Sequence, residues 1–123
     1  MTAKQILAVD DSRTMRNMLK QTLGEAGYEV SLAEDGVDGV ERLRDLTPDL
    51  VITDINMPRM DGFRFIEEVR GLGRLRGVPI LVLTTESDQA LRNRARAAGA
   101  TGWIVKPFDD GNLISAIRKV TVG

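Results

Sequence analysis

The sequence contains no cysteine and no histidine among its 123 residues. The lack of cysteine excludes disulfide bonds and thiolate metal sites. The lack of histidine excludes imidazole ligands, histidine acid–base catalysis and phosphohistidine formation on this chain. A bound metal ion would therefore have to be held by oxygen atoms, which favours a hard cation such as Mg²⁺.

Long hydrophobic runs and a strong charge imbalance are also missing. No apolar stretch approaches the roughly 20 residues of a transmembrane helix, and residues 1–5 lead into a strand without the features of a signal peptide. We therefore expect a cytoplasmic protein without membrane insertion.

The formal net charge of -1 argues against nucleic-acid binding, because no basic excess is available to meet phosphates. With 42% hydrophobic and 28% charged residues, the chain is expected to form one globular domain over residues 1–123.

Short apolar runs alternate with segments of helical periodicity along the chain. The runs cover residues 5–10, 28–33, 50–53, 80–83 and 102–105. All except residues 28–33 are expected to be buried strands, and the lack of polar alternation in residues 5–10 is typical of a strand covered on both faces. The helical segments between them start at residues that cap helices well, namely Ser12, Asp35, Asp61, Asp88 and Asp109 or Asp110. Five strand–helix repeats predict an α/β fold, (βα)5, with parallel strands and helices on both faces of the sheet.

Two of the predicted helices carry details that the structure can test. The first helix is predicted to bury one face made of Met15, Met18, Leu19, Leu23 and Ala26. The second is predicted to run from Asp35 to Leu46, before Pro48, and contains Gly39. Because an internal glycine costs about 1 kcal/mol relative to alanine, we expect the second helix to be one of the weaker elements.

Polar side chains follow four of the five predicted strands: Asp10 and Asp11, Asp54, Thr84, and Lys106. The carboxyl ends of parallel strands meet at one edge of a sheet, so we expect these side chains to lie together. Clustered carboxylates favour a cation, and a backbone carbonyl beside them would add a third oxygen ligand for Mg²⁺. Lys106 and Thr84 suit contacts with phosphoryl oxygens, and Asp54 can act as a nucleophile that forms an acyl phosphate.

Several sequence segments together resemble the receiver domain of bacterial response regulators. They are Val9-Asp10-Asp11-Ser12, residues 49–58, Met60-Asp61-Gly62, Leu83-Thr84-Thr85 and Lys106-Pro107-Phe108. The resemblance covers nearly the whole chain and is greatest to the stand-alone chemotaxis regulators. It implies a flavodoxin-like, doubly wound sheet in the order 2-1-3-4-5, and a single receiver domain without an output domain.

The resemblance also implies how phosphate and metal are bound. Asp54 resembles the phosphoacceptor, which takes its phosphoryl group from a histidine kinase. Asp11, Asp54 and the backbone carbonyl of Asn56 resemble the direct Mg²⁺ ligands, with Asp10 acting mainly through water. Thr84 and Lys106 resemble the residues that contact the phosphoryl group.

Further positions resemble those that read the phosphorylated state. Trp103 stands where the family carries the tyrosine or phenylalanine that swings inward as a switch, and its larger ring is expected to restrict that rotation. Glu86 and Asn56 stand at positions that tune self-dephosphorylation and contact a phosphatase. The Lys106–Pro107 peptide resembles the family's cis bond.

In this family the surface of helix four, strand five and helix five docks partners, and basic residues fall there in this chain: Arg92, Arg94, Arg96, Arg118 and Lys119. The alternative is a solvated helical face without a partner. Arg96 cannot share a helix face with both of the other arginines. We expect a monomer that is able to dimerise on phosphorylation.

Four functions are to be considered for a chain with these residues. The leading prediction is a signalling switch, most simply one that links a chemotaxis kinase to the flagellar motor switch, and that catalyses only its own phosphotransfer and slow autodephosphorylation. A phosphorelay intermediate or phosphate sink would use the same chemistry. A haloacid-dehalogenase-type phosphohydrolase needs an aspartate where this chain has Asn56. A flavodoxin-like binding module needs a loop that cradles phosphate, whereas residues 10–13 are acidic and lack glycine.

Overall fold

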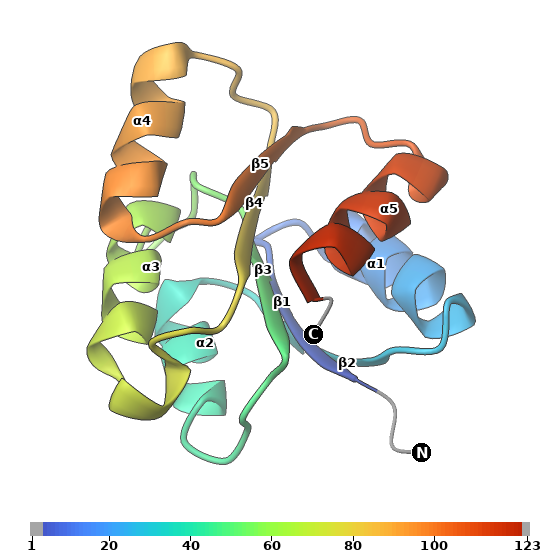
Figure 1. Cartoon of the computed structure of the whole chain (residues 1–123), viewed down its shortest axis with the longest axis horizontal. Coiled ribbons are helices and arrows are strands. Elements are labelled where there is room, and N and C mark those ends of the chain that lie inside the picture. The colour runs from blue at the N-terminus through green and yellow to red at the C-terminus, as the bar shows by residue number, and fades with distance from the viewer. Residues whose placement is uncertain (1–3, 122–123) are drawn as a thin grey trace.

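A single parallel sheet forms the centre of the molecule in the computed structural model, which describes residues 4–121. Its strand order is β2-β1-β3-β4-β5 (Figure 1), and every neighbouring pair is parallel. The strands are β1 (Gln5–Val9), β2 (Glu29–Ala33), β3 (Leu50–Thr53), β4 (Ile80–Thr84) and β5 (Gly102–Val105). The predicted doubly wound, flavodoxin-like architecture and its strand order are confirmed.

Helices cover both faces of this sheet. They are α1 (Arg13–Glu25), α2 (Gly36–Arg42), α3 (Gly62–Gly71), α4 (Gln89–Ala98) and α5 (Asp110–Thr121), with a short 3-10 turn, η1 (Gly73–Leu75), after α3. Figure 1 shows α1 and α5 on one face and α2, α3 and α4 on the other. Within residues 4–121 no helix combines the length and hydrophobicity needed to cross a membrane.

The predicted capping residues begin the helices. The side chains of Ser12, Asp35, Asp61 and Asp88 each accept a hydrogen bond from an amide in the first turn of the following helix. Asp109 does the same for α5, where its carboxylate accepts from the amide of Asn112 over 3.0 Å. These caps satisfy amides that a helix start otherwise leaves unpaired, and they fix where each loop after a strand ends.

The core consists of two layers separated by the sheet, because successive strand residues point to opposite faces. Ile6 and Ala8 pack with the α1 and α5 layer, whereas Leu7 and Val9 pack with the layer around Phe65. The strands β1, β3 and β4 are buried, but β2 and β5 are only partly buried. The expectation of a buried strand was wrong for β5, because it lies at one edge of the sheet; β2 lies at the other edge.

Two residues of the predicted face of α1 are exposed. Ala26 follows the end of the helix at Glu25, and Met18 points to solvent. Met18 is 47% exposed, while Leu19 and Leu23 are buried. Met15, Leu19 and Leu23 follow each other at intervals of four and form one ridge against the sheet, and Met18 lies to the solvent side of it.

The helix α2 is shorter than predicted, because it ends at Arg42 rather than at Leu46. Beyond it, the guanidinium of Arg74 donates hydrogen bonds to the backbone carbonyls of Leu43 and Leu46. These bonds from a distant loop satisfy carbonyls that further helical turns would have used. Gly39 is required by packing, since a Cβ there would lie 2.7 Å from Cε1 of Phe65.

Candidate functional site

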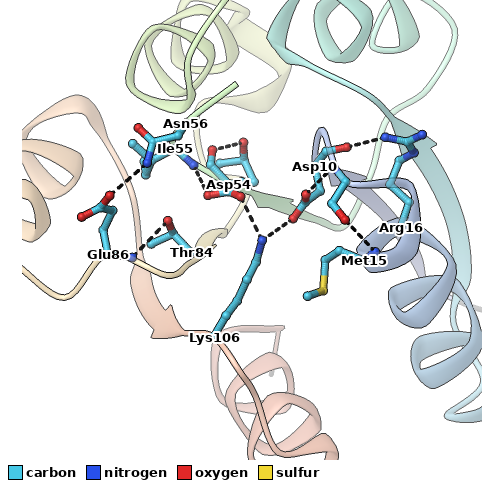
Figure 2. A network of polar contacts seen from close by, with 11 residues as sticks. Asp10, Met15, Arg16, Asp54, Ile55, Asn56, Thr84, Glu86 and Lys106 are labelled. Carbon is cyan, nitrogen blue, oxygen red and sulfur yellow. Dashed lines mark hydrogen bonds and ion pairs between the residues drawn. The ribbon is translucent and has the colours of Figure 1, made fainter. Parts of the chain in front are cut away.

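The polar residues at the strand ends converge as predicted. Val9 pairs with Thr53 in the sheet, so Asp10 and Asp54 leave neighbouring strands side by side. Thr84 is the last residue of β4, and Lys106 follows β5 directly. Figure 2 shows the Lys106 side chain reaching between the carboxylates of Asp10 and Asp54.

Lys106 forms ion pairs with both carboxylates. Its Nζ lies 2.6 Å from Oδ2 of Asp10 and 2.9 Å from Oδ2 of Asp54, and the lysine side chain is only 9% exposed. Burial alone would lower the pKa of Lys106, but hydrogen bonds and charge from Asp10 and Asp54 outweigh it and raise that pKa. Lys106 is therefore charged at neutral pH. The Lys106–Pro107 peptide is cis, as the family resemblance implies.

Asp10 is the most enclosed carboxylate of the site. It is 1% exposed, and its Oδ1 accepts from the amide of Ser12 over 2.9 Å. Burial raises the pKa of Asp10 and outweighs the opposing effects of Lys106 and the Ser12 amide. The arginine Arg16 of α1 donates to the backbone carbonyl of Asp10 over 2.8 Å, which fixes the loop from the other side.

The three aspartates form an oxygen cluster that fits a hard divalent cation. Carboxylate oxygens of Asp10, Asp11 and Asp54 lie within 4.8 Å of one another. Asp11 is exposed and the other two are buried, so the cluster opens to solvent on one side. Three carboxylates facing a single lysine leave excess negative charge, which a cation with an oxygen preference would neutralise. The residues present therefore fit Mg²⁺.

Asp54 is held in place through both its side chain and its backbone. Its Oδ1 accepts from the amide of Ile55 over 2.6 Å, and its carbonyl accepts from the hydroxyl of Thr53 over 2.8 Å. The start of α3 presses against it, since a Cβ at Gly62 would lie 2.1 Å from the Asp54 carbonyl oxygen. Only glycine permits this contact.

Glu86 connects three segments around the site. Its amide donates to the hydroxyl of Thr84 over 3.4 Å, and its Oε1 accepts from the amide side chain of Asn56 over 3.1 Å (Figure 2). The indole N–H of Trp103 donates to the Glu86 backbone carbonyl over 3.0 Å. The sequence indicated a shared role for Asn56 and Glu86 and a separate role for Trp103, but it carried no signal that hydrogen bonds join all three.

A second ion pair near the site was missed. Nε of Arg59 lies 2.7 Å from Oδ2 of Asp35, and Nη2 lies 3.1 Å from Oδ1. The sequence indicated Asp35 only as a helix cap. Its partner lies in the loop between β3 and α3, and a charged residue in a loop of this kind carries no signal of its own.

The chain matches the response regulator receiver domain over residues 6–118. The chain belongs to the response regulator receiver domain family. This is the family predicted from the sequence, and its members act in two-component signalling.

This receiver domain is similar to CheY proteins along its whole length. It is 40% identical over 119 residues to the chemotaxis protein CheY of Thermotoga maritima, covering 96% of this chain and 98% of that protein. The solved structure of chemotaxis protein CheY4 of Vibrio cholerae matches with a TM-score of 0.93 and 42% identity, covering 96% of this chain and 98% of that one. The prediction of a CheY-like protein is confirmed.

Another relative carries a metal. The structure of the receiver domain of sensor histidine kinase PA1611 from Pseudomonas aeruginosa PAO1 has a magnesium ion coordinated in the active site cleft. It matches this receiver domain with a TM-score of 0.91 and 27% identity, covering 98% of this chain and 99% of that one.

The basic residues of α4 and α5 do not form one patch. Arg92 and Arg96 line a groove of about 260 Å³ between α4 and β5, which Trp103 also lines. Arg94 lies on the other side of α4, with its Cζ 4.0 Å from the ring centroid of Phe63 in α3. This separation agrees with the prediction that the three arginines cannot share a face. Residues 118 and 119 line a different hollow, beside the end of α1.

Proposed function

We propose that this receiver domain is a switch that accepts a phosphoryl group on Asp54 from a histidine kinase. The placement of Asp54 supports this proposal. Its carboxylate lies 2.9 Å from the Nζ of Lys106 and shares the oxygen cluster of Asp10 and Asp11. A carboxylate between a fixed ammonium and a cation site is well suited to attack phosphorus, because the charge on the transferring group is neutralised from two directions.

Asp11, Asp54 and the backbone carbonyl of Asn56 would hold Mg²⁺, with Asp10 acting through water. When bound, Mg²⁺ supplies positive charge that offsets the carboxylates and the phosphoryl oxygens. The identity of the metal is supported by the carboxylate donor set of this site and by the magnesium ion in the receiver domain from P. aeruginosa.

In the transfer step, a carboxylate oxygen of Asp54 bonds to phosphorus while the bond from phosphorus to the histidine nitrogen of the kinase breaks. The hydrogen bond from the Ile55 amide to Oδ1 orients the carboxylate for this attack. Lys106 then pairs with a phosphoryl oxygen. The hydroxyl of Thr84 accepts from the Glu86 amide, so its own proton remains available to donate to another phosphoryl oxygen.

The structural change that follows phosphorylation of Asp54 involves Thr84 and Trp103. A shift of Thr84 toward the phosphoryl group draws it away from the Glu86 amide and changes the loop to which Trp103 is bonded. The groove between α4 and β5 lies beside Trp103, and this change alters the partner-binding face formed by α4, β5 and α5. The similarity to chemotaxis proteins supports a chemotaxis role in the cytoplasm. We propose the flagellar motor switch as the output, and a phosphatase that acts at Asn56 and Glu86.

The phosphorylation step is tested with Mg²⁺ and acetyl phosphate as phosphodonor, followed by intact-mass analysis. The wild type is expected to gain one acid-labile phosphoryl group, and Asp54→Asn none. Asp61→Asn is the matched control, because Asp61 caps α3 outside the oxygen cluster, and it should label like the wild type. Absence of label on the wild type, or equal label on Asp54→Asn, would refute the proposal.

The chemotaxis assignment needs a separate experiment. Phosphorylated protein is passed over an immobilised flagellar motor switch protein and over an immobilised histidine phosphotransfer domain. Retention by the motor protein only in the phosphorylated state supports the motor as output. Transfer of the phosphoryl group to the second domain, without retention by the motor protein, would instead establish a relay intermediate.

A further inference from the structure

A partly buried ion pair joins two loops next to the acceptor site. Asp35 lies in the loop between β2 and α2, and Arg59 lies in the loop between β3 and α3. The guanidinium meets the carboxylate with two nitrogens, over 2.7 and 3.1 Å. The Asp35 side chain is 3% exposed, whereas that of Arg59 is 54% exposed. A carboxylate so enclosed depends on its partner, so this pair fixes the two loops to each other.

The backbone of Arg59 is unusual. With φ of 65°, it is the one non-glycine residue of positive φ among residues 4–121. The left-handed conformation is unfavourable for arginine, and such residues persist where their surroundings hold them. The amide of Met60 donates to the carbonyl of Pro58 over 2.7 Å and closes the turn around Arg59. The Arg59 side chain then ties this turn to the loop after β2, through Asp35 over 2.7 Å and the exposed Glu34 over 3.8 Å.

Other contacts press the same two loops together. The amide of Gly36 donates to the carbonyl of Met60 over 3.3 Å, and a Cβ at Gly36 would lie 2.7 Å from Cγ of Met60. At the end of the loop, the amide of Gly62 donates to the carbonyl of Ile55 over 2.8 Å. Residues 55–61 are therefore anchored at their ends by the backbone and in the middle by Arg59 and Met60.

We infer that Arg59 is a positioning residue for the metal site. Its ion pair with Asp35 holds the loop that carries the Asn56 backbone carbonyl in the shape needed to bind Mg²⁺ beside Asp54. The inference rests on the proposed function for its metal site. It assigns Arg59 no contact with the metal or the phosphoryl group.

The charge of Arg59 makes this inference sharply testable. Acting through space alone, a positive residue in this loop opposes a cation at the oxygen cluster, so its removal would strengthen Mg²⁺ binding. If Arg59 instead acts by holding the loop in shape, its removal weakens Mg²⁺ binding. The pair persists at neutral pH: burial raises the pKa of Asp35, but hydrogen bonds from Arg59 and the Asp38 amide outweigh it and lower that pKa.

The experiment measures the Mg²⁺ dissociation constant of the full chain by isothermal titration calorimetry. Arg59→Ala and Asp35→Asn are expected to weaken Mg²⁺ binding about tenfold, the usual effect of losing a group that orients a ligand. The second variant retains a side-chain oxygen to cap α2. Arg64→Ala is the matched control, because Arg64 is an exposed arginine of α3 paired with Glu68 over 3.5 Å. Its Mg²⁺ affinity should equal that of the wild type.

Two further variants separate positioning from other effects. Arg59→Asn removes the ion pair but tolerates positive φ, and it is expected to bind Mg²⁺ as weakly as Arg59→Ala. Arg70→Ala removes hydrogen bonds to the carbonyls of Gly99, Leu75 and Arg76. It is expected to lower the free energy of unfolding with the Mg²⁺ affinity intact. Hydrogen exchange in residues 55–61 should accelerate in Arg59→Ala and not in Arg70→Ala.

Each alternative outcome is decisive. Unchanged or tighter Mg²⁺ binding by Arg59→Ala overturns the inference, as does wild-type affinity in Arg59→Asn. A wild type that binds no Mg²⁺ overturns it too. The calorimetry requires no phosphorylation, so a wild type that binds Mg²⁺ but gains no phosphoryl group on Asp54 refutes the proposed function alone.

Discussion

Trp103 donates its indole N–H to the backbone carbonyl of Glu86 over 3.0 Å, which ties β5 to the loop between β4 and α4. A phenylalanine would preserve a ring at this position but remove the donor. Trp103→Phe should therefore lower the free energy of unfolding in urea by about 1 kcal/mol, the typical net value of one hydrogen bond. Amide exchange in residues 85–88 should accelerate. Acetyl phosphate labelling of Asp54 should remain intact, and unaltered exchange in this loop would contradict the prediction.

Lys106→Met should leave two carboxylates facing each other without their partner. Removing one member of a buried ion pair costs about 3 kcal/mol of unfolding free energy, measured by urea denaturation without Mg²⁺. Saturating Mg²⁺ should then stabilise the variant more than the wild type, because the cation replaces the lost charge. Lys20→Met, on the exposed side of α1, should show neither effect. A variant that is insensitive to Mg²⁺ would show that the oxygen cluster does not bind it.

The Asp35–Arg59 pair predicts a pH dependence of stability. The pKa of Asp35 lies below its usual 3.8 in the folded state, because hydrogen bonds from Arg59 and the Asp38 amide outweigh burial. A lowered carboxyl pKa contributes stability that is present above the unfolded-state value and is lost as pH falls through the folded-state value. The difference in unfolding free energy between the wild type and Asp35→Asn should be constant from pH 7 to 5 and shrink below about pH 4. A difference that persists undiminished at pH 2 would contradict it.

Gly39→Ala should destabilise the fold although alanine favours helices. A Cβ there would lie 2.7 Å from Cε1 of Phe65 and 3.2 Å from Cγ2 of Val9. The overpacking cost exceeds the helix gain of about 1 kcal/mol, for a net loss of about 1–2 kcal/mol in urea denaturation. Gly24→Ala in α1 is the control, because nothing lies within 4 Å of a Cβ there. It should stabilise the protein by about 0.5–1 kcal/mol; a loss of stability there would contradict this account of both glycines.

The convergence of Asp10, Asp11, Asp54 and Lys106 could be predicted from sequence because it depends on topology. Any residue that follows a parallel strand reaches the same edge of the sheet, and continuous apolar runs mark such strands clearly. The helix caps were predictable for a similar reason, since each cap bonds to amides only two or three residues away. Both kinds of inference use short-range patterns and one general rule of sheet geometry.

The errors and omissions come from contacts between distant loops. The end of α2 is set by Arg74, which reaches the carbonyls of Leu43 and Leu46 from beyond α3. The pairing of Arg59 with Asp35 likewise joins loops that are separated by a whole strand. Helical spacing placed Met18 near the buried face of α1, but the breadth of the contact with the sheet decides whether that position is covered. None of these contacts between segments far apart in the sequence is indicated by a local sequence pattern.

The close approach of Gly62 to Asp54 determines which parts of the molecule are free to respond. With no space for even one carbon between position 62 and the Asp54 carbonyl, the acceptor strand and the start of α3 behave as one rigid block. The opposite wall of the site is attached differently, because Glu86 meets Asn56, Thr84 and Trp103 through single hydrogen bonds. If Asp54 is phosphorylated as proposed, we therefore expect the structural change to pass away from α3 and toward α4, where each hydrogen bond can be exchanged without deforming the core.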